Sequence, residues 1–237
     1  MKEFEALFGI DKEKVKPWCI LLPLLPKGVL DDFKVKDFSR GKIYSSGNAR
    51  DFTLINTGMG PGFTGDAVLR LKETNCRNLI LFGSCGLVKE KNGLGVASLV
   101  SPKQCNASEG FTDLLREKDL RSEVFYPDQE LFTDFLSASQ SVSEVNCATL
   151  VSLKLEEEIL DKLITRGIDI VEMECSAFFS AANSCGLKAL ALFYVSDIIK
   201  THPFYLDLSP ALKTKISACL KNSSQLLCQF IKKNSIV

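Results

Sequence analysis

Short runs of consecutive apolar residues recur along the chain. Near-continuous apolar runs are typical of strands that are covered on both faces of a sheet. The runs predict buried strands at Trp18–Leu25, Phe52–Thr57, Leu79–Ser84, Val96–Val100, Val145–Ser152, Asp169–Met173 and Ala189–Ser196. The strands are separated by segments of a different periodicity.

These segments place apolar residues at the spacing of one helix face, as Ala67, Val68 and Leu71 illustrate. Helices are predicted at Phe63–Asn75, Glu156–Arg166, Cys175–Cys185 and Pro210–Lys232. Strands that alternate with helices predict an α/β fold with a largely parallel central sheet. No Pro/Gly/Ser-rich linker or internal repeat divides the sequence, so we expect one domain over residues 1–237.

Charge and composition exclude several classes of function. The 29 basic residues equal the 29 acidic ones, which leaves no basic footprint for nucleic acid and no polybasic membrane patch. The sequence has no apolar run of ~18 residues or more, as a membrane-spanning helix requires. The first residues mix acids and lysines where a signal peptide has an apolar core. We therefore expect a cytoplasmic protein.

The nine cysteines are odd in number and none stands in a C-x-x-C pair. Most lie in apolar runs, which predicts reduced, buried thiols and not a disulfide framework. His202 is the single histidine, so the sequence predicts no zinc site and no other metal.

A glycine-rich segment follows the strand predicted at Phe52–Thr57. Its pattern Gly60-x-Gly62-x-x-Gly65 formally matches the dinucleotide fingerprint between a strand and a helix. That fingerprint needs an acid about 20 residues later, at the end of the next strand. The next strand has none at its end. A tight structural turn, or a turn that binds another ligand, therefore remains open.

The strand predicted at Leu79–Ser84 ends in Gly83-Ser84-Cys85-Gly86. Consecutive backbone N–H groups at such an end can form an anion-binding nest, to which the Ser84 hydroxyl adds a donor. A purely structural turn is the alternative. The segment lacks the G-x-S-x-G order of a nucleophile elbow, and a Ser/His/Asp triad would have to use His202.

Two carboxylates stand at strand ends. Glu172 and Glu174 alternate with apolar residues and so share one face of their strand. Glu174 either caps the next helix or accepts hydroxyls from a diol. Asp197 ends an apolar strand, where desolvation raises a carboxyl pKa and favours a general acid. An N-cap or turn aspartate is the alternative.

Taken in order, these segments resemble the nucleoside phosphorylase/nucleosidase superfamily. Its members include hexameric purine nucleoside phosphorylases, uridine phosphorylases and methylthioadenosine/adenosylhomocysteine nucleosidases. The resemblance covers roughly residues 50–205. It implies a three-layer α/β/α sandwich with a mixed, partly barrel-like central sheet, and cleavage of a ribose N-glycosidic bond.

The resemblance also implies site residues. Substrate binding falls to Gly58, Met59, Gly60, Gly83, Ser84, Cys85, Val151, Met173 and Glu174. Among these, Ser84 matches the phosphate-binding turn, Met173 packs against the ribose, and Glu174 holds the 2′- and 3′-hydroxyls. Asp197 matches the acid that protonates a purine at N7 as the base leaves. This acid is absent from the pyrimidine branch, so it points to purines.

The cations of the phosphate site depart from the family pattern. One family arginine is replaced by Leu81, and the loop over residues 22–28 lacks another. Lys27 offers a point charge there, without the bidentate grip of arginine. Arg40 matches an arginine that reaches into a neighbouring subunit, and Lys213 replaces a helper arginine beyond the acid. The loop also lacks the water-activating glutamate of nucleosidases.

The leading hypothesis is therefore an enzyme of purine salvage that cleaves a purine-like nucleoside. Phosphate would be its co-substrate, ribose 1-phosphate its product, and no other cofactor is expected. A hydrolytic nucleosidase and a catalytically silent nucleoside-binding protein are the alternatives, and a dehydrogenase that uses Gly60–Gly65 is a further one. The resemblance implies a homo-oligomer, from dimer to hexamer.

Overall fold

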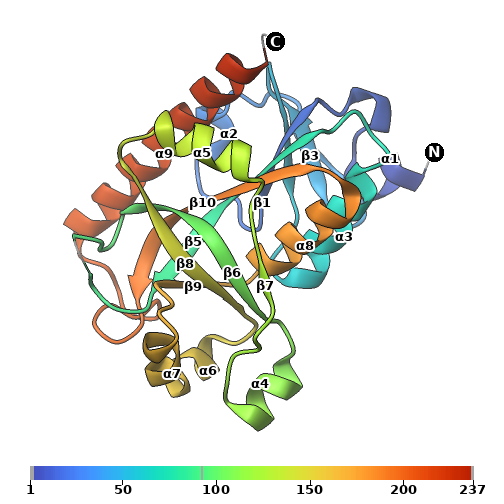
Figure 1. Cartoon of the computed structure of the whole chain (residues 1–237). Helices are drawn as coiled ribbons and strands as arrows, with labels where there is room; N and C mark the ends of the chain where they lie inside the picture. Colours follow the sequence, from blue (N-terminus) through green and yellow to red (C-terminus); the bar gives the residue numbers. More distant parts are fainter. Residues whose placement is uncertain (1–2, 92, 236–237) are drawn as a thin grey trace.

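A single branched sheet forms the centre of the computed structural model, which describes residues 3–91 and 93–235 (Figure 1). The strands are β1 (Trp18–Leu22), β2 (Ser39–Arg40), β3 (Ser45–Asn48), β4 (Thr53–Asn56), β5 (Asn78–Leu87), β6 (Leu99–Ser108), β7 (Val124–Phe125), β8 (Val142–Leu150), β9 (Ile170–Glu172) and β10 (Lys188–Ile198). The helices are α1 (Glu3–Phe8), α2 (Val29–Asp32), α3 (Pro61–Leu71), α4 (Phe111–Glu117), α5 (Gln129–Ser137), α6 (Leu153–Glu158), α7 (Leu160–Thr165), α8 (Cys175–Cys185) and α9 (Pro210–Asn234).

The sheet branches at β5. Along its whole length β5 runs parallel to β10, and this pairing closes the ring β10-β6-β8-β9-β5 into a five-stranded barrel. The first half of β5 also pairs in parallel with β1, which begins the open arm β1-β4-β3-β2. The pairings β5–β9, β6–β10 and β3–β4 are antiparallel. The predicted α/β fold with a mixed, partly barrel-like sheet is confirmed.

Helices cover both faces of the sheet, because alternate residues of a strand point to opposite faces. One set of positions packs against α3 and α8; it comprises Cys19, Leu21, Leu79, Leu81, Ala189, Ala191 and Phe193. The other set packs against α5 and α9; it comprises Trp18, Ile20, Leu22, Ile80, Phe82, Leu190 and Leu192. Since both sets are apolar, the three strands read as continuous apolar runs. Figure 1 shows the two helical layers on opposite sides of the sheet.

The predicted helix Glu156–Arg166 is wrong, because the chain forms two short helices there. Ser152 caps α6 by accepting the Leu155 N–H, and the non-helical backbone of Ile159 (φ −104°, ψ 11°) separates α6 from α7. Both helices pack on β8 and β9 through a third apolar cluster.

The predicted strand Val96–Val100 is also placed wrongly, since β6 runs from Leu99 to Ser108. Pro102, Lys103 and Gln104 interrupt its apolar pattern, and the register with β8 shifts between Pro102 and Gln104. A bulge at this point lets the strand continue through polar residues. The sequence pattern ended the strand where the bulge begins.

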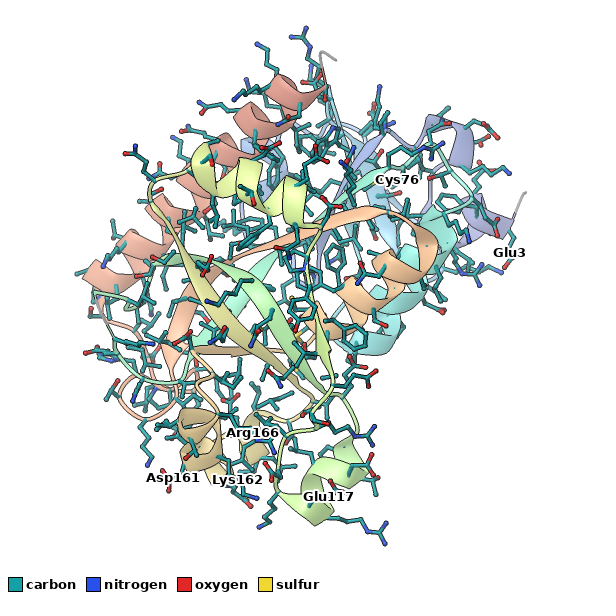
Figure 2. The ribbon with its side chains drawn as sticks, viewed as in Figure 1. Glu3, Cys76, Glu117, Asp161, Lys162 and Arg166 are labelled. Atoms are coloured by element: carbon teal, nitrogen blue, oxygen red, sulfur yellow. The ribbon has the colours of Figure 1, made fainter. Side chains whose placement is uncertain are left out.

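Charged side chains lie mainly on the outside of the molecule (Figure 2). At the end of the barrel near α4 and α7, Asp119 accepts Arg166 at 3.0 Å and lies 3.8 Å from Lys162. Exposed pairs of this kind contribute little to stability. Among the described residues, no helix is both long enough and apolar enough to cross a membrane. The single domain over 1–237 stays a prediction, and its residues 1–2, 92 and 236–237 lie outside the described ones.

Candidate active site

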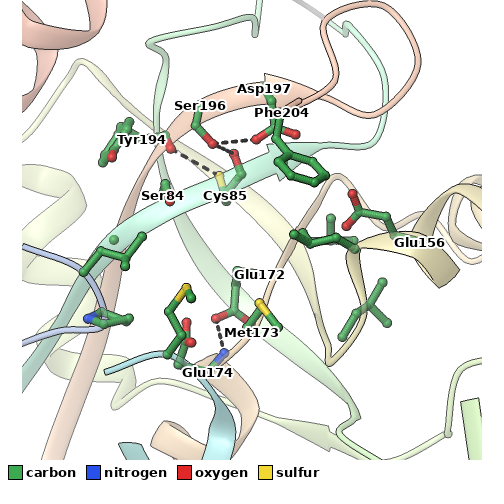
Figure 3. A pocket seen from close by; sticks show the side chains of 18 of the residues that line it. Ser84, Cys85, Glu156, Glu172, Met173, Glu174, Tyr194, Ser196, Asp197 and Phe204 are labelled. Carbon is green, nitrogen blue, oxygen red and sulfur yellow. Dashed lines mark hydrogen bonds between the residues drawn. The ribbon is translucent and has the colours of Figure 1, made fainter. Parts of the chain in front are cut away.

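A cavity of about 310 Å³ opens where the carboxyl ends of β1, β5 and β10 meet. Because these strands are mutually parallel, their ends lie at one edge of the sheet, where ligands bind in α/β proteins. The turn after β4, the end of β9 and helix α6 complete the wall, and Phe204 lies at the rim (Figure 3).

Glu174 joins two walls of the cavity. It precedes α8, it is buried, and its Oε1 accepts the Gly60 N–H at 2.6 Å. Gly58 (φ 77°) and Gly60 (φ 110°) hold backbone conformations that favour glycine, so the turn can present this N–H to the carboxylate. Burial raises the pKa of Glu174 to about 7, and the N–H bonds from Gly60 and Met173 oppose the rise. Glu174 therefore titrates near neutrality.

Glu172 lies beside Glu174 and is bonded to the protein on both oxygens. Its Oε2 accepts the N–H groups of Glu174 at 2.6 Å and Cys175 at 2.7 Å, and its Oε1 accepts the Thr149 hydroxyl. Burial raises the pKa of the Glu172 carboxyl well above its usual range. These bonds fix the start of α8, and with it the position of Glu174.

Asp197 lies in the wall opposite Glu174 (Figure 3). The register between β10 and β5 shifts at Ser196, so that Asp197 pairs with Gly86. Ser196 Oγ donates to Asp197 Oδ1 at 2.6 Å. Burial raises the pKa of Asp197, and the Ser196 bond opposes this. A Cβ on Gly86 would come within 3.2 Å of Asp197 Oδ2, so the glycine leaves room for the carboxyl.

Gly83, Ser84 and Cys85 line the cavity between these two carboxyls, in the second half of strand β5. Ser84 pairs in register with Tyr194, and Cys85 with Val195. The arrangement thus places one buried carboxyl at each side of a strand end that carries a hydroxyl.

Comparison with known proteins agrees with this architecture. Residues 22–232 match the sequence model of the phosphorylase superfamily. The chain belongs to the phosphorylase superfamily. A curated relative, the DeoD-type purine nucleoside phosphorylase of Hahella chejuensis, is 28% identical over 179 residues, which cover 67% of this chain and 69% of the relative.

Two solved structures share the fold. Uridine phosphorylase from Vibrio fischeri ES114 superposes with a TM-score of 0.75 at 15% identity, over 94% of this chain and 95% of that chain. The 5′-methylthioadenosine/S-adenosyl homocysteine nucleosidase of Campylobacter jejuni gives a TM-score of 0.69 at 13% identity, over 92% and 99%. The superfamily fold thus serves both phosphorylases and nucleosidases.

Part of the site expected for this superfamily gathers at the cavity. Its wall includes seven of the expected residues: Met59, Gly83, Ser84, Cys85, Met173, Glu174 and Asp197. Gly58 and Gly60 flank Met59 in the turn, and Val151 lies between two lining residues, Leu150 and Ser152, without lining the cavity itself.

The three expected cations do not line the cavity. Lys27 is exposed and follows the lining residue Pro26, whereas Arg40 is exposed on β2 at the end of the open arm. Lys213 lies on α9, exposed, 3.4 Å from Asp207. Within residues 3–91 and 93–235, no lysine, arginine or histidine lines the cavity. Lys27 lies in a loop, Arg40 on a short strand and Lys213 on a helix, and the apolar pattern of the sequence does not indicate how far each lies from the cavity.

The dinucleotide interpretation of the glycine turn does not fit this superfamily site. The Gly60 N–H, which would bind a phosphate, already donates to the Glu174 carboxylate. A second anion at this N–H would meet that carboxylate. Gly62 and Gly65 lie inside α3, and a Cβ on Gly65 would meet Ala177 of α8 at 3.8 Å, so Gly65 is a helix-packing position.

Three buried cysteine thiols also lie close to Glu172. One ligand atom each of Cys105, Cys147, Cys175 and Glu172 lies within 4.8 Å of the others, a donor set that suits zinc. Here Cys105 Sγ lies 3.2 Å from Thr149 Oγ1, and Cys147 Sγ lies 3.8 Å from Glu172 Oε1. Internal hydrogen bonds thus satisfy these groups, and the expectation of no metal stays a prediction.

Replacing Thr149 by valine is expected to lower the free energy of unfolding by about 1–3 kcal/mol, because three buried partners, Glu172, Ser176 and Cys105, lose a bond. Thr149 Oγ1 donates to Glu172 and accepts the Ser176 N–H at 2.9 Å. Urea denaturation of the wild type and the variant measures the change. Thr165→Val is the control, since its exposed hydroxyl bonds only a carbonyl of its own helix. An equal loss of unfolding free energy in both variants would contradict the role of Thr149 in fixing Glu172 and the start of α8.

The sequence interpretation missed Glu156, Tyr194 and Phe204 as cavity residues. Glu156 begins the run Glu156-Glu157-Glu158, which by charge alone is typical of a solvated helix face. Glu156 lies next to Leu155 on the buried side of α6, whereas Glu158 lies on the exposed side.

Proposed function

We propose that this protein cleaves the N-glycosidic bond of a purine nucleoside. Its membership of the phosphorylase superfamily supports an enzyme that acts on nucleosides. The observation that carries the proposal is the pair of buried carboxyls, Glu174 and Asp197, in opposite walls of one cavity. Cleavage of this bond separates a cationic sugar from an anionic base, so it needs one carboxyl in each protonation state.

Glu174, as an ionised carboxylate, would hold the ribose. A carboxylate oxygen can accept the 2′- and 3′-hydroxyls, and its charge stabilises a sugar that becomes like an oxocarbenium ion. Met173 lies beside it in the cavity wall and offers apolar contact to the ribose ring. The bond from Gly60 keeps the carboxylate oriented before the substrate arrives.

Asp197 would act in its protonated form. Its raised pKa retains the proton at higher pH than an exposed aspartate does. Transfer of this proton to N7 neutralises the electron pair that the base takes from the breaking C1′–N9 bond. A pyrimidine has no N7, so this acid favours purines.

Phosphate is the acceptor that we propose first. One of its oxygens would attack C1′ while the C1′–N9 bond breaks, which yields ribose 1-phosphate and the free base. Ser84 and the neighbouring backbone at the end of β5 would bind the phosphate. Lys27, which follows the lining residue Pro26, would supply a point charge.

A homo-oligomer would complete this phosphate site, with Arg40 donated by a second copy. The exposed apolar side chains Leu24, Met59 and Phe204 at the cavity give such a copy a surface to cover. We propose that the assembly works in the cytoplasm, in purine salvage.

Hydrolysis is the second candidate function. It is favoured by the lack of any cation in the described wall of the cavity. Water would then attack C1′, and the products would be free ribose and base.

Base release from a nucleoside panel tests the proposal. Adenosine, inosine, guanosine, uridine, methylthioadenosine and adenosylhomocysteine are each incubated with and without phosphate, and the products are separated by chromatography. We expect phosphate-dependent release from purine nucleosides with formation of ribose 1-phosphate. Release of free ribose without phosphate would support hydrolysis instead. Binding without release from any substrate would indicate a silent nucleoside-binding protein.

A further inference from the structure

Glu156 points into the cavity from α6 (Figure 3). Its side chain is buried, with 6% of the residue exposed, yet its carboxyl makes no hydrogen bond or ion pair with any described residue. The next two acids behave differently, since Glu157 lies 3.8 Å from Lys154 and Glu158 accepts Lys118 at 2.8 Å on the surface. Since this carboxyl faces the cavity, a ligand that fills the cavity would displace its water and would have to supply the hydrogen bonds instead.

The neighbourhood of Glu156 shows which part of a ligand it would meet. Burial raises the pKa of Glu156 to about 8, and the charge of Asp197 contributes to the rise. Both carboxyls line the same cavity, and Figure 3 shows them near Phe204 and away from Glu174. If Asp197 serves N7 of a purine, the substituent on C6 lies next to it, because N7 and the C6 substituent share one edge of the base.

The polar side chains of the cavity suit an amino group on C6 better than a carbonyl oxygen. Its described wall has carboxyls and hydroxyls but no asparagine, glutamine, lysine, arginine, histidine or tryptophan. It thus has no fixed side-chain N–H donor for a carbonyl oxygen. An amino group can donate to Glu156 in either protonation state, whereas a carbonyl is satisfied only by the protonated acid.

We propose that Glu156 binds the amino group on C6 of the base, so that the site prefers 6-aminopurine nucleosides to 6-oxopurine nucleosides. This inference rests on the proposed function, through the placement of N7 at Asp197. Glu156 is a specificity-determining residue in this proposal, and it takes no part in bond cleavage.

The test compares kcat/KM for adenosine, inosine and purine riboside, which has no substituent on C6. The variants are Glu156→Gln and, as the matched control, Glu158→Gln in the same helix. Above pH 8, where Glu156 is ionised, we expect the wild type to favour adenosine over inosine by about 10-fold or more, as a hydrogen bond to a charged group allows. Glu156→Gln should reduce this ratio by about the same factor, because an amide both donates and accepts.

Purine riboside separates recognition from a structural effect. Its kcat/KM should change less than threefold in Glu156→Gln, whereas a distorted site would lower kcat/KM for all three substrates together. Glu158→Gln should leave every ratio unchanged. A wild-type preference for inosine, or an unchanged adenosine-to-inosine ratio in Glu156→Gln, would overturn the inference.

Equilibrium binding of adenine and hypoxanthine keeps the inference testable if no nucleoside is cleaved. Tighter binding of adenine that is lost in Glu156→Gln would support the role of Glu156 while the proposed reaction fails. Equal binding of both bases, or binding of neither, would reject the role of Glu156 itself.

Discussion

Replacing Asp197 by asparagine is expected to slow base release by about 100- to 10,000-fold, the usual contribution of a general acid. Asparagine keeps the shape of the side chain and can still hydrogen-bond Ser196, but it has no proton to transfer to N7. Asp197 is buried, so the charged base that forms without protonation would lie in a poorly solvated wall. The loss should therefore fall on kcat.

The measurement uses steady-state kinetics on the best substrate of the panel and on its N7-methylated form. The methylated base already carries the positive charge that protonation would supply, so Asp197→Asn should slow its release far less. Asp207→Asn, in the exposed loop before α9, is the matched control and should retain the wild-type rate. Equal losses for the two substrates would show that Asp197 acts in some way other than as an acid.

The pH profile follows from the direction of the pKa shift. The acid form of Asp197 is lost as pH rises through its raised pKa, so wild-type kcat should fall on the alkaline side. Asp197→Asn should lack this fall. A variant with the same alkaline limb as the wild type would assign that limb to another group.

The sequence predicted the centre of the fold well because β1, β5 and β10 are buried on both faces. Leu79 and Leu81 pack on one helical layer, whereas Ile80 and Phe82 pack on the other, so each position must be apolar. Such a run leaves little ambiguity about a strand. The polar strands β2 and β3, at the end of the open arm, carry no such pattern and were not predicted.

The residues of the candidate site that were predicted stand directly at strand ends. Ser84 and Asp197 lie in the second halves of β5 and β10, and these strands are parallel, so their approach at one edge of the sheet follows from chain position. Glu174 follows β9, which is antiparallel to β5, so its place at the cavity depends on the closure of the barrel. Glu156 reaches the cavity from the buried side of α6, and Phe204 from a loop. Their positions depend on packing between distant segments, which periodicity does not record.

Replacing Glu174 by glutamine is expected to lower kcat/KM for ribonucleosides by roughly 100-fold or more, because two hydroxyls lose a charged acceptor. Glutamine retains an oxygen for the Gly60 N–H, so the glycine turn should stay in place. Glu174→Ala removes that bond as well, and it should also lower thermal stability. The difference in kcat/KM and thermal stability between the two variants separates the effect of the Glu174 charge from the effect of its hydrogen bond to the glycine turn.

The pH dependence of KM gives a second readout for Glu174. Its pKa is raised to about 7, so the ionised form that accepts hydroxyls becomes populated as pH rises through 7. Wild-type KM should therefore fall between pH 6 and pH 8, to an extent set by a single ionisation. In Glu174→Gln this fall should disappear.

Substrates with fewer hydroxyls show whether the contact is to the ribose. A 2′,3′-dideoxynucleoside offers Glu174 no donor, so its kcat/KM should differ much less between the wild type and Glu174→Gln. Glu73→Gln, at an exposed position just beyond α3, is the matched control and should behave as the wild type. If kcat/KM falls by the same factor for the ribonucleoside and the dideoxynucleoside in Glu174→Gln, Glu174 stabilises the cavity without binding the sugar hydroxyls.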